Sequence, residues 1–577
     1  MTDTDNTTLS ALLARQVLAA LVRNGVTRIA YSPGSRNAPF AYAVADLQAQ
    51  GTVKVQPFTD ERAAGFWALG AVRASGQPAA IITTSGTAAA EVHPAVEEAR
   101  NQGLPIVVIT ADRPAEMRGV GASQTTHQEG MYARSVLEWD SLGPGDGTRP
   151  QQVSDRVRRL LARARGWWGE PGPVHLNVAF RDPLTPGSQW DVPAMEPGED
   201  APSIPERSGP DWDQAIRSDL RTIVIAGDRA DRAVGQAAAR RGIPLLAEPT
   251  SGLVDLSTWI PFTPTLVSNL AGYVQQVIVT GHPTLSRAVT ALLADPEVRV
   301  TVVAQRAEWV DVAGNAQQVV AALNDIDTPQ LADENWLQLW RRASVVAESV
   351  LVAEADAQLN LLSACRRIGE ASSMPLWLGA SNTIRAFDIG QFVPLQAPAY
   401  ANRGLAGIDG TIASAWGAAA AQERPVRAVI GDMTFAVDLS TLTQAPAEYA
   451  DDVGGPALDL QVFVLDDGGA GIFASLEHGA ADPDTYEKFF AVPPHVDIVA
   501  AARACGWDAH EAGTLEELEK VLSQPVRGRS VVRVPVPRPG ELLRQISADT
   551  AVALTNDQQF QETLSCISGG SAKTGRQ

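Results

Sequence analysis

Two acidic segments follow apolar runs in the C-terminal third of the chain, and their oxygens could bind a divalent cation. Ile430-Gly431-Asp432 ends one run, and Leu465-Asp466-Asp467-Gly468-Gly469 ends the next. A hard cation such as Mg²⁺ takes oxygen ligands and commonly shares a phosphate. Gly-Asp and Asp-Gly pairs also mark ordinary turns. These residues alone leave a metal site and a pair of turns as alternatives.

Polar loops also follow apolar runs in the N-terminal third, where residues 79–83 and 105–110 are rich in Ile and Val, as buried parallel strands are. Loops at the carboxyl ends of parallel strands are where open α/β sheets bind ligands. We therefore expect ligand-binding side chains in three loops: Ser32-Pro33-Gly34-Ser35-Arg36, Thr84-Ser85-Gly86-Thr87 and Ala111-Asp112-Arg113-Pro114.

The ordered set of motifs resembles the thiamin-diphosphate-dependent enzymes, in which a loop beginning with Gly-Asp and ending with Asn holds Mg²⁺ and the diphosphate. A glutamate on a separate domain faces the cofactor there, and Glu61 matches it. Within those enzymes, about residues 9–540 are similar to the 2-succinyl-5-enolpyruvyl-6-hydroxy-3-cyclohexene-1-carboxylate synthase family of menaquinone biosynthesis. The further segments that carry this resemblance are Phe58 to Arg62, Thr83 to Ala88, Asn402-Arg403-Gly404, Gly407-Ile408-Asp409-Gly410 and Gly471-Ile472-Phe473.

The resemblance implies a thiamin-diphosphate-binding fold of three successive α/β domains with mainly parallel sheets. It also implies thiamin diphosphate with Mg²⁺ or Mn²⁺, and a homodimer or homotetramer with active sites between chains. The expected division is a pyrimidine-binding domain (1–184), a linker (185–210), a central domain (211–335), a pyrophosphate-binding domain (336–545) and a C-terminal tail (546–577).

The resemblance assigns roles around the cofactor. Glu61 is the expected catalytic residue, hydrogen-bonded to the aminopyrimidine ring, although an acid in the first turn of a helix also complements the helix dipole. Asp432, Asp467 and the carbonyl of Gly469 are the expected metal ligands. The remaining expected cofactor contacts are Thr434 to a phosphate oxygen, Ile408 as a prop for the bent cofactor, and Ile472 in the apolar wall; plain core packing is the alternative for the two isoleucines.

The expected substrates, 2-oxoglutarate and isochorismate, are both dicarboxylates, which arginine binds through its two-pronged guanidinium group. Each arginine taken alone is equally compatible with a solvated surface charge. The expected isochorismate residues are Ser35, Arg36, Gln124 and Arg287. The expected 2-oxoglutarate residues are Ser381, Arg385 and Arg403, with Ile472 and Phe473 near the reacting carbon.

The sequence departs from the family pattern in two places that bear on the metal loop. Asp467 stands where the family usually has Asn, and the segment from Asp432 to Asp466 is lengthened by an acidic, Gly-rich insertion at 447–456, which we expect on the surface. A third departure is Ser286, where a lysine usually precedes the arginine that corresponds to Arg287. We expect His127, in the loop that contains Gln124, to be structural.

The elements that must position these residues can be placed from periodicity and turn signals. We expect a helix over 9–21 that stops at Asn24-Gly25, a helix beginning near Glu61, and a long helical region over 336–368. We expect the last thirty or so residues to be frayed. Strands are expected at 27–32, 79–83, 105–110, 222–226, 277–280, 300–303, 376–379, 427–430, 460–465 and 530–534.

Composition excludes several classes of protein. The formal net charge of −20 argues against a nucleic-acid-binding protein. Three cysteines without a CxxC pair disfavour a disulfide scaffold and a thiolate zinc site. No signal peptide or membrane span is recognisable, so we expect a cytoplasmic protein without integral membrane contact.

The expected activity is that of a transferase: decarboxylation of 2-oxoglutarate and Michael-type addition of the resulting succinyl carbanion to isochorismate. One alternative is another thiamin-diphosphate carboligase or decarboxylase of the acetolactate synthase type, which also carries FAD. The arginines suit dicarboxylates better than pyruvate. A second alternative is a degenerate member that only binds ligands, against which Glu61, Asp432 and the arginines argue.

Overall fold

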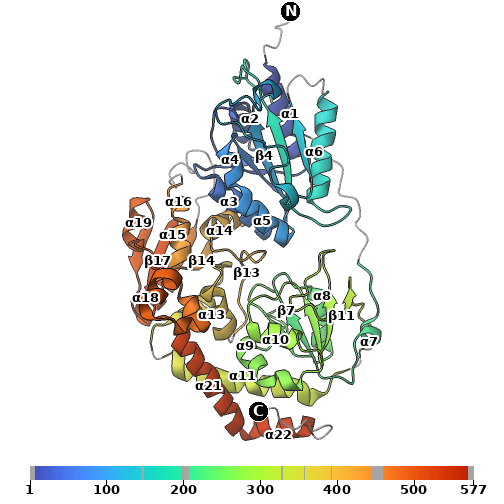
Figure 1. Cartoon of the computed structure of the whole chain (residues 1–577), viewed down its shortest axis with the longest axis vertical. Helices are drawn as coiled ribbons and strands as arrows, with labels where there is room; N and C mark the ends of the chain where they lie inside the picture. Colours follow the sequence, from blue (N-terminus) through green and yellow to red (C-terminus); the bar gives the residue numbers. More distant parts are fainter. Residues whose placement is uncertain are drawn as a thin grey trace, which may run out of the picture.

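The computed structural model describes residues 7–143, 149–195, 207–326, 329, 331–356, 358–391, 393–444 and 459–568. It contains three parallel sheets flanked by helices, which we call the first, second and third units in chain order (Figure 1). This confirms the predicted α/β class. Among the described helices, none is long and apolar enough to cross a membrane.

The first unit is a six-stranded parallel sheet in the order β2-β1-β3-β4-β6-β5. Its central strands, such as β3 and β4, are fully buried, which explains their continuous apolar sequences. The strands are β1 (Arg28–Tyr31), β2 (Lys54–Pro57), β3 (Ala79–Thr83), β4 (Ile106–Asp112), β5 (Trp139–Leu142) and β6 (Val174–Ala179). The helices are α1 (Leu9–Arg23), α2 (Ala38–Ala49), α3 (Glu61–Ser75), α4 (Thr87–Glu91), α5 (His93–Gln102) and α6 (Pro150–Ala164).

The second unit is a five-stranded parallel sheet in the order β11-β10-β9-β7-β8. Its strands are β7 (Thr222–Ala226), β8 (Leu245–Ala247), β9 (Gln276–Thr280), β10 (Arg299–Val303) and β11 (Ala316–Val320). Its helices are α7 (Trp212–Ala215), α8 (Arg232–Arg240), α9 (Thr263–Leu270) and α10 (Arg287–Leu293).

The third unit is again six-stranded and parallel, in the order β13-β12-β14-β15-β17-β16. Counted from its own first strand, this order repeats that of the first unit. The strands are β12 (Leu376–Leu378), β13 (Ala399–Tyr400), β14 (Val426–Gly431), β15 (Leu460–Asp466), β16 (Asp508–Glu511) and β17 (Arg529–Pro535). The helices are α12 (Leu361–Glu370), α13 (Asn382–Gly390), α14 (Thr411–Gln422), α15 (Asp432–Val437), α16 (Leu439–Leu442), α18 (Pro483–Tyr486), α19 (Ile498–Ala504) and α20 (Leu515–Leu522).

Long helices run along one side of the second and third units in Figure 1. The helical region predicted over 336–368 is two helices, α11 (Glu334–Ala355) and α12, and the side chain of Asn360 caps the second. The prediction that the chain frays after about residue 546 is wrong as far as Ser568. There, α21 (Gly540–Asn556) and α22 (Gln558–Ser568) bury Ile546, Leu554 and Phe560 in the core that includes α11.

The first and third units meet where α3 crosses α14 (Figure 1). Glycines permit this crossing. A Cβ added to Gly70 of α3 would lie 2.6 Å from the Cα of Ser414, and one added to Gly417 of α14 would lie 2.8 Å from the carbonyl carbon of Trp67. Both distances are well below the separation of carbon atoms in ordinary contact. The two backbones therefore approach more closely than any side chain allows.

Candidate active site

The predicted metal ligands lie together at the carboxyl ends of β14 and β15, which are neighbours in the third sheet. Asp432 follows β14 directly and is 3% exposed. Its Oδ2 accepts a hydrogen bond from the amide of Gly469 at 2.7 Å, which ties the two loops together. Gly469 has φ +123°, and an added Cβ would lie 3.0 Å from the carbonyl carbon of Ala491, so this turn requires glycine.

The charge at this edge suits a cation. Burial raises the pKa of Asp432 to about 6, and burial together with the charge of Asp432 raises the pKa of Asp467 to about 7. Two carboxylates held together in a partly dry site are relieved by a divalent ion. No cluster of three or more His, Cys, Asp or Glu side chains suits a metal among the described residues. A cation here would therefore complete its coordination with a carbonyl and a bound anion.

The predicted apolar and hydroxyl contacts lie on the same edge. Thr434 is buried within α15, and Ile408 is half-buried just before α14. Ile472 and Phe473 are half-buried on a 3-10 helix, η4 (Gly471–Ser475), so neither is fully enclosed in a core. The ring of Phe473 packs edge-on against Phe490, with centroids 5.8 Å apart.

Glu61 begins α3 at the seam between the first and third units. Burial raises its pKa above the usual value for a glutamate, and the neighbouring acids Asp60 and Glu91 contribute to the rise. The residues on either side of Glu61 hold it at the seam, because Asp60 accepts a hydrogen bond from Ser440 and Arg62 donates to the carbonyl of Val437 at 2.6 Å.

Three of the four predicted isochorismate residues, Ser35, Arg36 and Gln124, lie in loops at the carboxyl edge of the first sheet. Gln124 donates to the carbonyl of Ser85 at 2.9 Å, and Arg36 is half-buried with its guanidinium on the carbonyl of Phe180 at 3.0 Å. Arg113 donates to the carbonyl of Gln124 at 2.9 Å, and its pKa is lowered by burial and by the charge of Arg36. Sequence reasoning noted the loop of Arg113 but did not assign this side chain to the site.

Ser35, next to Arg36, is exposed in the same loop. His127 is also exposed, and the insertion at 447–456 lies outside the described residues.

The predicted 2-oxoglutarate residues converge. Ser381 has φ +71° and caps α13, and its carbonyl accepts a hydrogen bond from Arg385 at 2.8 Å. Arg403 is 3% exposed and donates to the hydroxyl of Thr284. The pKa of Arg385 is lowered by burial and by the charge of Arg403, so the two guanidinium groups form a positive site suited to an anion.

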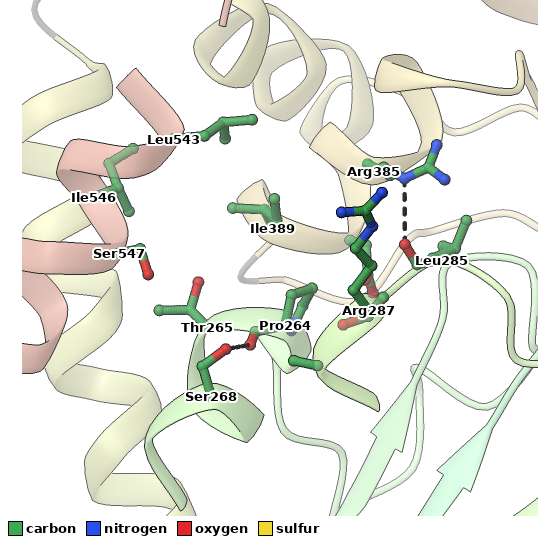
Figure 2. Close-up of a pocket in the computed structure, with 13 residues that line it drawn as sticks. Pro264, Thr265, Ser268, Leu285, Arg287, Arg385, Ile389, Leu543, Ile546 and Ser547 are labelled. Carbon is green, nitrogen blue, oxygen red and sulfur yellow. Dashed lines mark hydrogen bonds between the residues drawn. The ribbon is translucent and has the colours of Figure 1, made fainter. Parts of the chain in front are cut away.

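Arg287 lies with Arg385 and apart from the first-sheet loops. Its side chain is 73% exposed and forms an ion pair with Glu477 at 3.1 Å. Figure 2 shows Arg287 and Arg385 on one side of a cavity of about 270 Å³ between the second and third units. The cavity is lined by Pro264, Thr265, Ser268, Leu285, Ser286, Arg287, Ala288, Arg385, Asp388, Ile389, Leu543, Ile546 and Ser547.

A contact that sequence reasoning missed joins the metal edge to the arginines. The side chain of Asn382 lies near Asp467 and opposes the rise in its pKa, and Asn382 directly follows Ser381. Ser381, three residues after the end of β12, thus contacts one arginine, and the next residue lies near the acidic pair. The signal lay in the Ser-Asn dipeptide at a predicted strand end.

Comparisons with known proteins agree with this geometry. Residues 12–131 match the family "Thiamine pyrophosphate enzyme, N-terminal TPP binding domain", and residues 386–534 match "Thiamine pyrophosphate enzyme, C-terminal TPP binding domain". Proteins named 2-succinyl-5-enolpyruvyl-6-hydroxy-3-cyclohexene-1-carboxylate synthase align over nearly the whole chain. The one from Nocardioides sp. is 39% identical, covering 91% of this chain and 95% of the relative.

The synthase of Kineococcus radiotolerans is 40% identical and also covers 91% of this chain and 95% of the relative. That of Rhodococcus erythropolis is 35% identical, covering 94% of this chain and 99% of the relative. Identity at this level over whole chains, with both cofactor-binding domains matched, shows that the chain belongs to the 2-succinyl-5-enolpyruvyl-6-hydroxy-3-cyclohexene-1-carboxylate synthase family of thiamin-diphosphate-dependent enzymes.

Proposed function

We propose that the chain decarboxylates 2-oxoglutarate and adds the resulting succinyl carbanion to isochorismate in menaquinone biosynthesis. The name shared by its relatives supports this reaction. The observation in the structure that carries it is the contact of Asn382 with Asp467 beside the bond between Ser381 and Arg385. A dicarboxylate held by the arginines would lie close to the residues that would hold the metal.

The proposed cofactor contacts are the residues that surround the acidic pair. Asp432, Asp467 and the carbonyl of Gly469 would hold Mg²⁺ or Mn²⁺, with Thr434, Ile408 and Ile472 against the cofactor. Bound thiamin diphosphate supplies an electron sink for the decarboxylation. Glu61 would hold and release a proton at the pyrimidine ring, for which its raised pKa suits it.

The proposed substrate contacts fall into two groups of side chains. Ser381, Arg385 and Arg403 would bind the carboxylates of 2-oxoglutarate, with Phe473 and Ile472 beside the reacting carbon. Isochorismate would be bound by Ser35, Arg36, Gln124 and Arg287. Guanidinium groups paired in this way orient carboxylates through two parallel hydrogen bonds and exclude neutral analogues.

We also propose that two chains form the smallest active unit and that the protein is cytoplasmic. Within the part of the chain that the structure describes, no hydrogen bond or ion pair joins Ser35, Arg36 or Gln124 to Ser381, Arg385 or Arg403. A second chain could bring the two groups together. The free cysteines support a reducing compartment.

The test is a reconstitution with protein, thiamin diphosphate, Mg²⁺, 2-oxoglutarate and isochorismate. We expect isochorismate consumption that stops when any one component is omitted. A parallel reaction with pyruvate in place of 2-oxoglutarate examines the acetolactate synthase alternative. Turnover of pyruvate with no turnover of 2-oxoglutarate would contradict the proposal.

A further inference from the structure

The carboxyl ends of the second sheet carry a buried acid that no role above uses. Strand order reverses around β7, and in doubly wound sheets such a switch point is where ligands bind. Glu248 follows β8, the edge strand next to β7, and is 6% exposed. Its side chain bonds the loop that follows β9, so a carboxyl group lies close to the position where a ligand is expected.

Glu248 holds one short loop through two hydrogen bonds. Its Oε1 accepts from the amide of Thr284 at 2.8 Å and from the amide of Leu285 at 2.9 Å. Its Oε2 is buried without a hydrogen-bond partner among the described residues. Burial raises the pKa of Glu248 to about 7, against the opposing charge of Arg403. One oxygen thus fixes the loop, and burial disfavours the charged form of the group.

The same two loop residues bind the arginines of the third unit. The hydroxyl of Thr284 accepts from Arg403, and the carbonyl of Leu285 accepts from the Nε of Arg385 at 3.2 Å, a bond drawn in Figure 2. Burial also raises the pKa of Asp388, which lies near these groups, well above its usual value. The neighbouring acids therefore leave the two guanidinium groups with charge available for an anion.

We propose that Glu248 is a positioning residue of the 2-oxoglutarate site, which fixes the 284–285 loop so that Thr284 and Leu285 orient Arg403 and Arg385. This inference rests on the proposed function of the two arginines. It gives the second unit a part in binding 2-oxoglutarate, although that unit supplies neither Arg385 nor Arg403. Small displacements of positioning groups are costly because both guanidinium forks must meet their carboxylates at once.

The test compares Glu248→Ala, Glu248→Gln and Thr284→Val by steady-state kinetics with each substrate varied. We expect Glu248→Ala and Thr284→Val to raise KM for 2-oxoglutarate about tenfold, with kcat and KM for isochorismate changing less than about threefold. Glu248→Gln should remain within about threefold of the wild type, because an amide oxygen still accepts both backbone hydrogen bonds. Thr284→Val keeps the shape and the backbone bonds, so it decides the question if Glu248→Ala fails to fold.

The matched control is Asp311→Ala, which removes another carboxylate of the second unit that accepts two backbone amides, at 3.2 and 3.0 Å. Folded Glu248→Ala and Thr284→Val with an unchanged KM for 2-oxoglutarate would overturn the inference, as would a change equal to that of the control. The variant Arg403→Ala distinguishes a wrong substrate site from a wrong role for Glu248. If it leaves KM for 2-oxoglutarate unchanged, the proposed substrate site is wrong; if it raises KM while the two variants do not, only the role of Glu248 is wrong.

Discussion

Replacing Gly70 with Ala should disturb the seam between the first and third units more than its single methyl group suggests. The added Cβ would lie 2.6 Å from the Cα of Ser414 and 2.5 Å from its carbonyl carbon. Carbon atoms in ordinary contact are about 3.5 Å apart or more, so α3 and α14 must separate by about 1 Å. The obstacle is backbone, and no change of rotamer relieves it.

Overpacking of this kind costs about 1–3 kcal/mol, and a backbone clash belongs at the upper end. Alanine in place of glycine within a helix returns about 1 kcal/mol. We therefore expect a net loss of about 2 kcal/mol. Because Glu61 begins the same helix, a shift of about 1 Å should also lower kcat by roughly tenfold or more.

The assays are thermal unfolding and steady-state turnover with saturating cofactor and substrates. Gly272→Ala is the control, since a Cβ added there meets no atom within 4 Å. We expect a lower unfolding midpoint and lower kcat for Gly70→Ala only. Equal midpoints and equal kcat for the two variants would refute the argument that this crossing requires glycine.

The remaining predictions concern single side chains. Glu61→Gln should lower kcat by at least about a hundredfold while cofactor binding, followed by calorimetry, persists; a near wild-type rate would remove the proposed role. Arg403→Ala should raise KM for 2-oxoglutarate by roughly ten- to hundredfold, the worth of a lost charge-assisted bond, whereas Arg36→Ala should act mainly on isochorismate; equal effects on both substrates would exclude two separate groups. Asp467→Asn should keep activity at saturating Mg²⁺ but weaken Mg²⁺ binding, because an amide oxygen coordinates the ion without a negative charge. The measurement is a titration of cofactor binding against the metal. An unchanged metal dependence would mean that Asp467 does not reach the ion. Burial lowers the pKa of His175 to about 3. The unfolded chain therefore takes up a proton below about pH 6.5, whereas the folded protein does not. The free energy of unfolding should fall by about 1.4 kcal/mol per pH unit from 6.5 towards 3. His175→Gln should make the unfolding midpoint less dependent on pH in that window, and an identical slope would contradict this.

The buried parallel strands were predictable because enclosure on both faces leaves an uninterrupted apolar sequence. The predictions at 79–83 and 222–226 coincide with β3 and β7. Edge strands such as β2 and β16 were not predicted, since four residues of mixed polarity carry no such signal and pairing with a neighbour makes them strands. The C-terminal helices were missed for a related reason: their few buried side chains pack on α11, which is distant in sequence.

The residues of the candidate site also fall into two groups, those placed by local sequence and those placed by tertiary contacts. Asp432, Asp467 and Arg403 could be proposed for the site from the sequence because each stands in a short motif near a strand end, where local sequence and local structure coincide. Glu248 was not predicted, because its partners Thr284 and Leu285 lie 36 and 37 residues away and only the folded sheet brings them together. Residues that act through such tertiary contacts leave no pattern along the chain.

The identical strand orders of the first and third units have an evolutionary consequence. In each unit the helix after the second strand, α3 or α14, is the one that crosses its counterpart, and each contributes a glycine to the crossing. A twofold-symmetric pair of identical subunits presents the same patch to itself, and fusion of two such copies would leave this arrangement within one polypeptide. The residues proposed for the site are divided between these two equivalent units, with Glu61 in the first and Asp432 and Asp467 in the third.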